Sequence, residues 1–224
     1  MSPHNITSSG VSLARSQPPA LSANFLSRKH LFNLFESSVP GATLVIAPAG
    51  FGKTTLVAEW VKENARPTFW YTVDANDTIQ DFQAHVIAAV TSHFPNFFAN
   101  VDQLEHFEPG EAVQLLAAAV GQLDGEYNFV IDGGREENPD ISSYGQLIAD
   151  SVPNNVHLVI IRRNSPMTSL ARYAALGNLS VITSADLKFS EDEVKSIASI
   201  NGVDLNENGN AKELAMCEGW PSAV

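Results

Sequence analysis

The sequence predicts an α/β protein in which a parallel β-sheet lies between helices. Short apolar runs rich in β-branched residues alternate along the chain with stretches of helical periodicity. One such run, at residues 43–46, leads through a turn of small residues directly into a helix start near Lys53. The length also fits, because 224 residues with 44% hydrophobic content can bury a full α/β core.

The N-terminal segment differs from the rest of the chain in composition. Residues 1–20 are rich in Ser, Pro, Asn and Gly and show no periodicity, which predicts a disordered or loosely attached arm. Leu31, Leu34 and Phe35 then share one helical face within residues 27–38, which predicts an amphipathic helix ahead of the first strand.

The turn after the first strand matches a phosphate-binding loop. In such a loop the backbone N–H groups converge on phosphate oxygens at a helix N-terminus. Lys53 would reach the β- and γ-phosphates and Thr54 would hold Mg²⁺. The strict motif opens with Gly where this chain has Ala47, and we expect this methyl group to be tolerated because it precedes the phosphate cradle. The predicted nucleotide-binding residues of the loop are Ala49, Gly50, Phe51, Gly52, Lys53, Thr54 and Thr55.

The remaining elements follow in the same alternation. Further buried strands are predicted at residues 67–73, 127–132, 156–161 and 179–182, which makes five strands in all. Helices are predicted by apolar spacing at 79–90, 111–123, 141–152 and 167–176, with a loop or lid at 92–110. Trp70 and Tyr71 are assigned to core packing.

The predicted strand at 127–132 ends in a residue with a carboxylate side chain. Asp132 ends this apolar strand, as a phosphate-loop protein requires to place a carboxylate near Mg²⁺, often through a water molecule. The alternative is an aspartate that only opens a turn. A second acid commonly follows to polarise the attacking water, but here that residue is Gly133. Glu136 and Glu137 come soon after, and either could substitute for the missing acid.

The strand at 156–161 is followed by two arginines. Ligands of parallel sheets bind beyond the carboxyl ends of the strands, so Arg162 or Arg163 could sense a γ-phosphate. The alternative is a pair of solvated or carboxylate-paired cations. Arg172 is a second candidate phosphate contact of lower weight.

The C-terminal part carries helix-start signals. Ser190 to Glu193 forms a capping box, and a last helix is expected to reach Cys217. The Gly219-Trp-Pro stretch breaks that helix, and Pro221 suits the first position of another. Because the sequence stops at Val224, we expect the chain to be the front part of a longer protein or of a longer ancestor.

Composition excludes several functions. A formal net charge of −12, with only 13 Lys and Arg, argues against binding of a nucleic-acid backbone by this chain. The single cysteine, Cys217, excludes an intramolecular disulfide and favours a reducing compartment. Without a signal peptide or an apolar run of membrane-spanning length, the expected location is the cytoplasm.

In combination, these motifs resemble the nucleotide-binding region of MalT-like, large LuxR-type transcriptional activators, which are signal-transduction ATPases of the STAND class. The resemblance covers about residues 20 to 224. It implies a P-loop NTPase domain over 21–186, with the Arg163 strand between those of Lys53 and Asp132, and a partial helical subdomain over 187–224. The segments that carry it are residues 47–55, 70–74, 130–132, 161–166, 170–172, 187–190 and 219–221.

The resemblance also implies roles for single residues. Thr55 matches the α-phosphate position, Arg163 the sensor arginine, Pro221 a subdomain proline that touches the nucleotide, and Arg28 an arginine near the base. Gly133 stands where relatives usually carry a second Asp, which puts hydrolysis but not binding in doubt. In such proteins ADP holds a closed state, and ATP with an inducer favours an open state that self-associates. Their C-terminal helix-turn-helix is absent from this chain.

Three hypotheses follow. The leading one is a regulatory module that switches between ADP and ATP states, with Mg²⁺, and hydrolyses ATP weakly or not at all. The second is an active ATPase or phosphotransferase that uses Glu136 or Glu137 as a base. The third is an interaction scaffold that binds no nucleotide.

Overall fold

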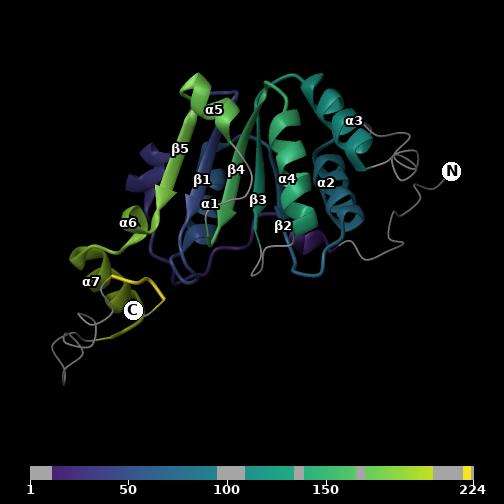
Figure 1. The fold of residues 1–224 in the computed structure, drawn as a ribbon. Helices are drawn as coiled ribbons and strands as arrows, with labels where there is room; N and C mark the ends of the chain where they lie inside the picture. Colours follow the sequence, from purple (N-terminus) through teal and green to yellow (C-terminus); the bar gives the residue numbers. More distant parts are fainter. Residues whose placement is uncertain (1–11, 95–108, 134–138, 165–169, 204–218, 223–224) are drawn as a thin grey trace.

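A computed structural model describes residues 12–94, 109–133, 139–164, 170–203 and 219–222. Five parallel strands form one sheet in the order β2-β3-β4-β1-β5 (Figure 1). The predicted five-stranded α/β fold is confirmed, and β4 lies between β1 and β3 as the resemblance implied. The strands are β1 (Gly41–Ile46), β2 (Thr68–Thr72), β3 (Tyr127–Asp132), β4 (Val156–Arg162) and β5 (Leu179–Thr183).

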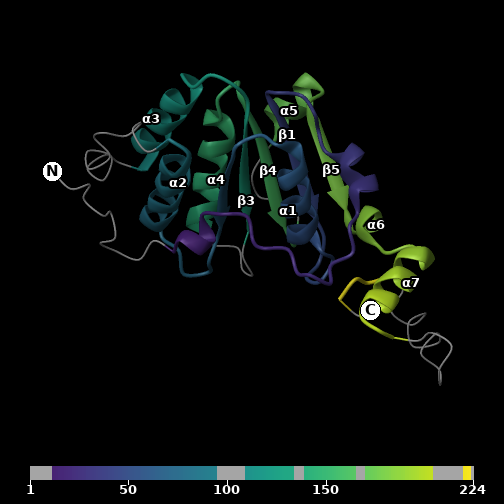
Figure 2. The same cartoon turned by 180° about the vertical axis from the view of Figure 1, so that it is seen from behind.

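Helices cover both faces of the sheet (Figures 1 and 2). One face packs against α1 (Lys53–Asn64), and the other against α2 (Ile79–His93) and α4 (Pro139–Ser151). A further helix, α3 (Pro109–Gly121), packs on α2 and α4. The chain continues through α5 (Ala171–Leu176), α6 (Ser184–Leu187) and α7 (Glu191–Ile200).

Successive side chains of a strand point to opposite faces of the sheet, so the core is divided between these two faces. In β2, Phe69 and Tyr71 face the α2 side, whereas Trp70 faces α1. Trp70 and Tyr71 have no solvent-exposed surface, which confirms their assignment to the core. The central strands β1, β3 and β4 are buried almost along their whole length, as expected of a parallel sheet covered on both faces.

Residues 12–16 of the N-terminal segment make more contacts than their composition predicts. A short 3-10 helix, η1 (Leu13–Arg15), is followed by the buried Ser16. The guanidinium of Arg15 pairs with the Asp77 carboxylate and donates to the Thr72 carbonyl at 2.9 Å. The expectation of a disordered arm therefore does not hold for residues 12–16, because a single arginine supplies contacts that composition does not reveal.

The predicted amphipathic helix at 27–38 is instead a six-residue 3-10 helix, η2 (Lys29–Leu34). It ends because Phe35 takes an extended backbone conformation, with ψ of 140°. Phe35 then stacks on Trp60 of α1, with ring centroids 4.4 Å apart. The chain thus leaves the helix at the residue whose aromatic ring is buried against α1.

Two helix starts follow their capping signals. Ser190 and Glu193 form the predicted capping box at the start of α7. The same arrangement of Thr183 and Asp186 begins α6, which the sequence reasoning had not predicted. At the ends of the loop or lid predicted at 92–110, α2 continues to His93 and α3 already begins at Pro109. The rest of that loop, residues 95–108, and the predicted last helix to Cys217 lie outside the described residues.

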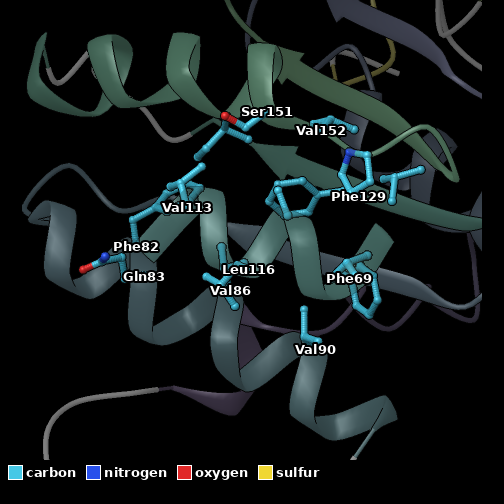
Figure 3. A pocket seen from close by; sticks show the side chains of 15 residues that line it. Phe69, Phe82, Gln83, Val86, Val90, Val113, Leu116, Phe129, Ser151 and Val152 are labelled. Atoms are coloured by element: carbon cyan, nitrogen blue, oxygen red, sulfur yellow. The ribbon is translucent and has the colours of Figure 1, made fainter. Parts of the chain in front are cut away.

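A cavity of about 60 Å³ lies between α3 and the sheet (Figure 3). Its lining is almost entirely apolar and includes Phe69, Val86, Val113, Leu116 and Phe129. None of the phosphate-loop residues lines it, so the cavity is separate from that loop. Among the described residues, no helix has the length and apolar character needed to cross a membrane.

Candidate nucleotide-binding site

The loop between β1 and α1 adopts a conformation that requires glycine at two positions. Gly50 and Gly52 have positive φ angles of 81° and 73°, where other residues are strained. The Gly52 carbonyl accepts the first hydrogen bond of α1, from the Leu56 N–H at 2.9 Å. The loop thus ends at a helix N-terminus, where unpaired N–H groups favour an anion.

Lys53 lies inside this loop. Its side chain is 9% exposed, and its Nζ donates to the Pro48 carbonyl at 2.8 Å. Burial lowers the pKa of Lys53, the nearby Arg163 lowers it further, and Asp132 opposes the shift. A bound anion would stabilise the charged form of Lys53, which burial and Arg163 destabilise. The loop therefore has the electrostatic environment of a phosphate-binding site.

The Thr54 hydroxyl donates to the Asp132 carboxylate at 2.9 Å. Asp132 is 8% exposed, and burial raises its pKa to about 6, although the Thr54 hydrogen bond and Lys53 both favour the ionised form. A hydroxyl beside a carboxylate matches the oxygen ligands of Mg²⁺. Within the described part of the chain, no group of three or more His, Cys, Asp or Glu could hold a metal ion.

Gly133 follows Asp132 in a closely packed environment. Its N–H donates to the Ile161 carbonyl at 2.8 Å. A Cβ at this position would lie 2.8 Å from that same carbonyl oxygen and 3.4 Å from Cδ of Arg162. The backbone as it stands leaves no room for a second acidic side chain. The alternative bases Glu136 and Glu137 lie outside the described residues.

Arg163 directly follows β4 and is partly exposed. Arg162 is paired with Ile46 at the end of β1, and Ile161 with Asp132 at the end of β3, so Arg163 lies at the strand ends beside the loop. The strand order explains this proximity, because β4 is hydrogen-bonded to both β1 and β3. Lys53, Thr54, Asp132 and Arg163 therefore meet at one edge of the sheet.

Arg172 does not lie at the phosphate-loop edge of the sheet. Its guanidinium donates to the Asp150 and Val152 carbonyls at 3.2 and 3.4 Å and to the Asn154 side chain at 3.1 Å. These three acceptors precede the start of β4, at the edge of the sheet opposite to the strand carboxyl ends. The structure thus contradicts the predicted phosphate contact of Arg172, because α5 precedes β5 and lies at the amino ends of the strands.

Arg28 has protein partners for its guanidinium. It donates four hydrogen bonds, two to the Glu193 carboxylate and one each to the carbonyls of Leu187 and Lys188. Its backbone N–H also donates to Glu59 of α1 at 3.0 Å. Arg28 therefore joins α1 to the start of α7, and its predicted contact with a base stays a prediction.

Pro221 is brought to the phosphate loop by its neighbours. Nε1 of Trp220 donates to the Ala49 carbonyl, and Ser222 donates to the Gly50 carbonyl. Sequence reasoning missed both Trp220 and Ser222. The Gly-Trp-Pro motif marked the place, but no local signal reveals a partner 172 positions away.

Solved structures share this fold. A signal transduction ATPase with numerous domains (STAND) protein with a tetratricopeptide repeat sensor, PH0952 from Pyrococcus horikoshii, matches with a TM-score of 0.66 and 15% identity, over 92% of this chain and 30% of its own. CDC6P from Pyrobaculum aerophilum matches with a TM-score of 0.52 and 16% identity, over 85% and 53%. The fold is that of a P-loop NTPase domain.

Sequence relatives narrow this class, although no protein-family model matches the chain. The HTH-type transcriptional regulator MalT of Yersinia pestis (strain Pestoides F) is 24% identical over 216 residues, which are 93% of this chain and 24% of the relative. MalT of Klebsiella pneumoniae subsp. pneumoniae is 25% identical over 218 residues, with the same shares. The resemblance to MalT-like regulators is thus confirmed, and the chain spans about a quarter of these relatives' length.

Proposed function

We propose that the chain is the ATP- and ADP-binding switch module of a MalT-type transcription regulator and that it hydrolyses ATP weakly or not at all. The supporting observation is the convergence of the loop, Lys53, the Thr54–Asp132 pair and Arg163 at one edge of the sheet. The similarity to MalT-type regulators supports a regulatory role for such a module.

Each side chain has a separate task in this proposal. The loop N–H groups and Lys53 bind the phosphates, and Arg163 adds positive charge beside them. Thr54 and Asp132 hold Mg²⁺, directly or through water. When bound, the ion would neutralise charge on the phosphate oxygens.

Slow or absent turnover is proposed because Gly133 supplies no second carboxylate and has no room for one. Hydrolysis requires that an attacking water be oriented and deprotonated. A site that binds ATP without this group would hold the nucleotide. Such behaviour suits a switch.

Calorimetric titration with ADP and Mg²⁺ tests binding. Lys53→Ala should abolish measurable affinity, because it removes the buried cation from the loop. Lys62→Ala is the matched control, since Lys62 is exposed in the last turn of the same helix. Absence of binding by the unsubstituted chain would support the scaffold hypothesis instead. Equal affinity of both variants would contradict the role proposed for Lys53.

Single-turnover hydrolysis of γ-labelled ATP separates the switch from the enzyme. We expect little phosphate release over the time in which ATP stays bound. Steady release that disappears in Lys53→Ala would instead favour an ATPase or phosphotransferase that uses Glu136 or Glu137.

Switching requires two states with different affinities for ADP and ATP. We propose that the ATP state is the more open one and self-associates. Light scattering with each nucleotide tests this, and equal affinities with an unchanged hydrodynamic radius would contradict it. We further propose a cytoplasmic location, and that DNA is bound by a helix-turn-helix outside this chain.

A further inference from the structure

The segment Gly219–Ser222 binds two consecutive carbonyl groups of the phosphate loop. Nε1 of Trp220 donates to the Ala49 carbonyl at 3.1 Å. The backbone N–H of Ser222 donates to the Gly50 carbonyl at 3.1 Å, and its Oγ donates to the same oxygen at 2.8 Å. Three donors of one short segment therefore fix the orientation of two peptide groups in the loop.

The planarity of the peptide bond gives this contact a consequence for phosphate binding. In a trans peptide, the C=O and the following N–H point in opposite directions. The Ala49 carbonyl shares its plane with the Gly50 N–H, and the Gly50 carbonyl with the Phe51 N–H. When both carbonyls are held by the segment, these two N–H groups point to the opposite side of the loop backbone, away from the segment.

The close approach depends on glycine at position 50. A Cβ there would lie 2.5 Å from Oγ of Ser222 and 2.9 Å from Nε1 of Trp220. Gly50 also needs its positive φ of 81°. The loop backbone and the segment thus pack closely, without space for a side chain between them. Such close packing is not expected of a nonspecific surface contact.

The other end of the segment is anchored as well. The Gly219 carbonyl accepts from the Phe189 N–H at 2.8 Å. Phe189 lies beneath the Arg28 guanidinium, whose Cζ is 5.0 Å from the ring centroid. Arg28 in turn binds Glu193 of α7 at 2.6 Å. The segment is therefore held between the loop and the start of α7.

We propose that Trp220 and Ser222 are positioning residues for the phosphate loop: by binding the Ala49 and Gly50 carbonyls, they orient the Gly50 and Phe51 N–H groups for a nucleotide phosphate. This inference rests on the proposed nucleotide binding. It also provides a route for regulation, because coupling between two binding events is reciprocal. A bound diphosphate would strengthen the attachment of the segment, and release of the segment would weaken phosphate binding.

The test compares ADP with AMP, which lacks the β-phosphate. In the 224-residue chain, Trp220→Phe keeps an aromatic ring but removes the indole N–H, and Ser222→Ala removes the hydroxyl. We expect the double variant to lose ADP affinity about five- to tenfold, since each lost hydrogen bond contributes modestly. Affinity for AMP should change less than about twofold, because those N–H groups would face the β-phosphate.

Ser196→Ala is the control, because its hydroxyl donates within α7 to the Asp192 carbonyl. Circular dichroism would establish that all variants are folded. Unchanged ADP affinity in the double variant would overturn the inference and leave the proposed function intact. An equal loss for ADP and AMP would also overturn it, since a general structural defect affects both. Absence of ADP binding by the unsubstituted chain would overturn the proposed function itself.

Discussion

At Asp132, burial favours the neutral carboxyl, whereas the proposed binding of Mg²⁺ requires the ionised carboxylate. Its pKa of about 6 is above the ordinary value for aspartate because burial disfavours the charged form. The folded protein therefore retains this proton between about pH 4 and 6, where the unfolded chain has lost it. The carboxyl thus favours the folded state at low pH, and this contribution is lost as the pH rises through about 6.

We accordingly expect Asp132→Asn to stabilise the nucleotide-free protein at pH 7.5 and to have little effect near pH 4. The amide oxygen can still accept from Thr54. Urea unfolding at both pH values measures the difference between the variant and the unsubstituted chain. Burial lowers the pKa of His157 to about 4, so this residue makes the free energy of unfolding rise with pH. Because His157 is present in both proteins, its contribution cancels in the difference. A variant less stable at pH 7.5 would contradict the prediction.

Gly133 offers a second prediction, on packing. Gly133→Ala should lower the free energy of unfolding by about 1–3 kcal/mol, because its methyl group would press on the Ile161 carbonyl. Gly110→Ala is the control, since a Cβ there meets only Leu147 at an ordinary 3.5 Å. Chemical denaturation gives both values. If Gly133→Ala were as stable as the control, the space beside Asp132 would be larger than described.

Among the helices, α3 leaves the cavity beneath it unfilled. Ala117→Leu should stabilise the protein by about 1 kcal/mol, because about 24 cal/mol are lost for each Å³ of an empty cavity of about 60 Å³. Leucine and alanine have similar helix propensities, so packing dominates the change. Ala118→Leu is the matched control, since Ala118 is exposed on the same helix. Thermal unfolding would reveal overpacking as a lower melting temperature for Ala117→Leu.

The attachment of α7 depends on the buried pair of Arg28 and Glu193. Arg28→Met should destabilise the protein by about 2–4 kcal/mol, because the Leu187 and Lys188 carbonyls lose the guanidinium donor and the Glu193 carboxylate keeps the Ser190 N–H but loses its charged partner. Lys29→Met is the control, since the pair of Lys29 and Glu63 is about half exposed and worth less than about 1 kcal/mol. Similar losses in both variants would show that Arg28 contributes no more than a surface ion pair.

The charge of the whole molecule leads to a last prediction. With a net charge of −12, the chain should not shift duplex DNA in a gel at low salt, even though its relatives are named as HTH-type regulators. A DNA-binding protein of similar length serves as the positive control. Binding that weakens with added salt would show that a basic surface exists despite the overall charge.

Much of the fold could be predicted because its signals are local. The order of strands and helices follows from side-chain periodicity, and the phosphate loop from glycines that permit positive φ angles. The capping box at Ser190 is another local signal. These features depend on residues within a few positions of one another. They were therefore visible in the sequence, and so were the loop lysine and the aspartate at the end of a strand as separate residues.

Other features depend on which distant segments meet. Arg172 is excluded from the site because α5 lies at the amino ends of the strands, and Arg28 is bound to Glu193, 165 positions away. Trp220 and Ser222 reach the loop for the same kind of reason. The sequence alone therefore determines the chemistry of the loop, through local backbone conformation and residue type. The folded structure determines which side chains surround that loop, because strand order and helix packing bring together residues that no local pattern connects.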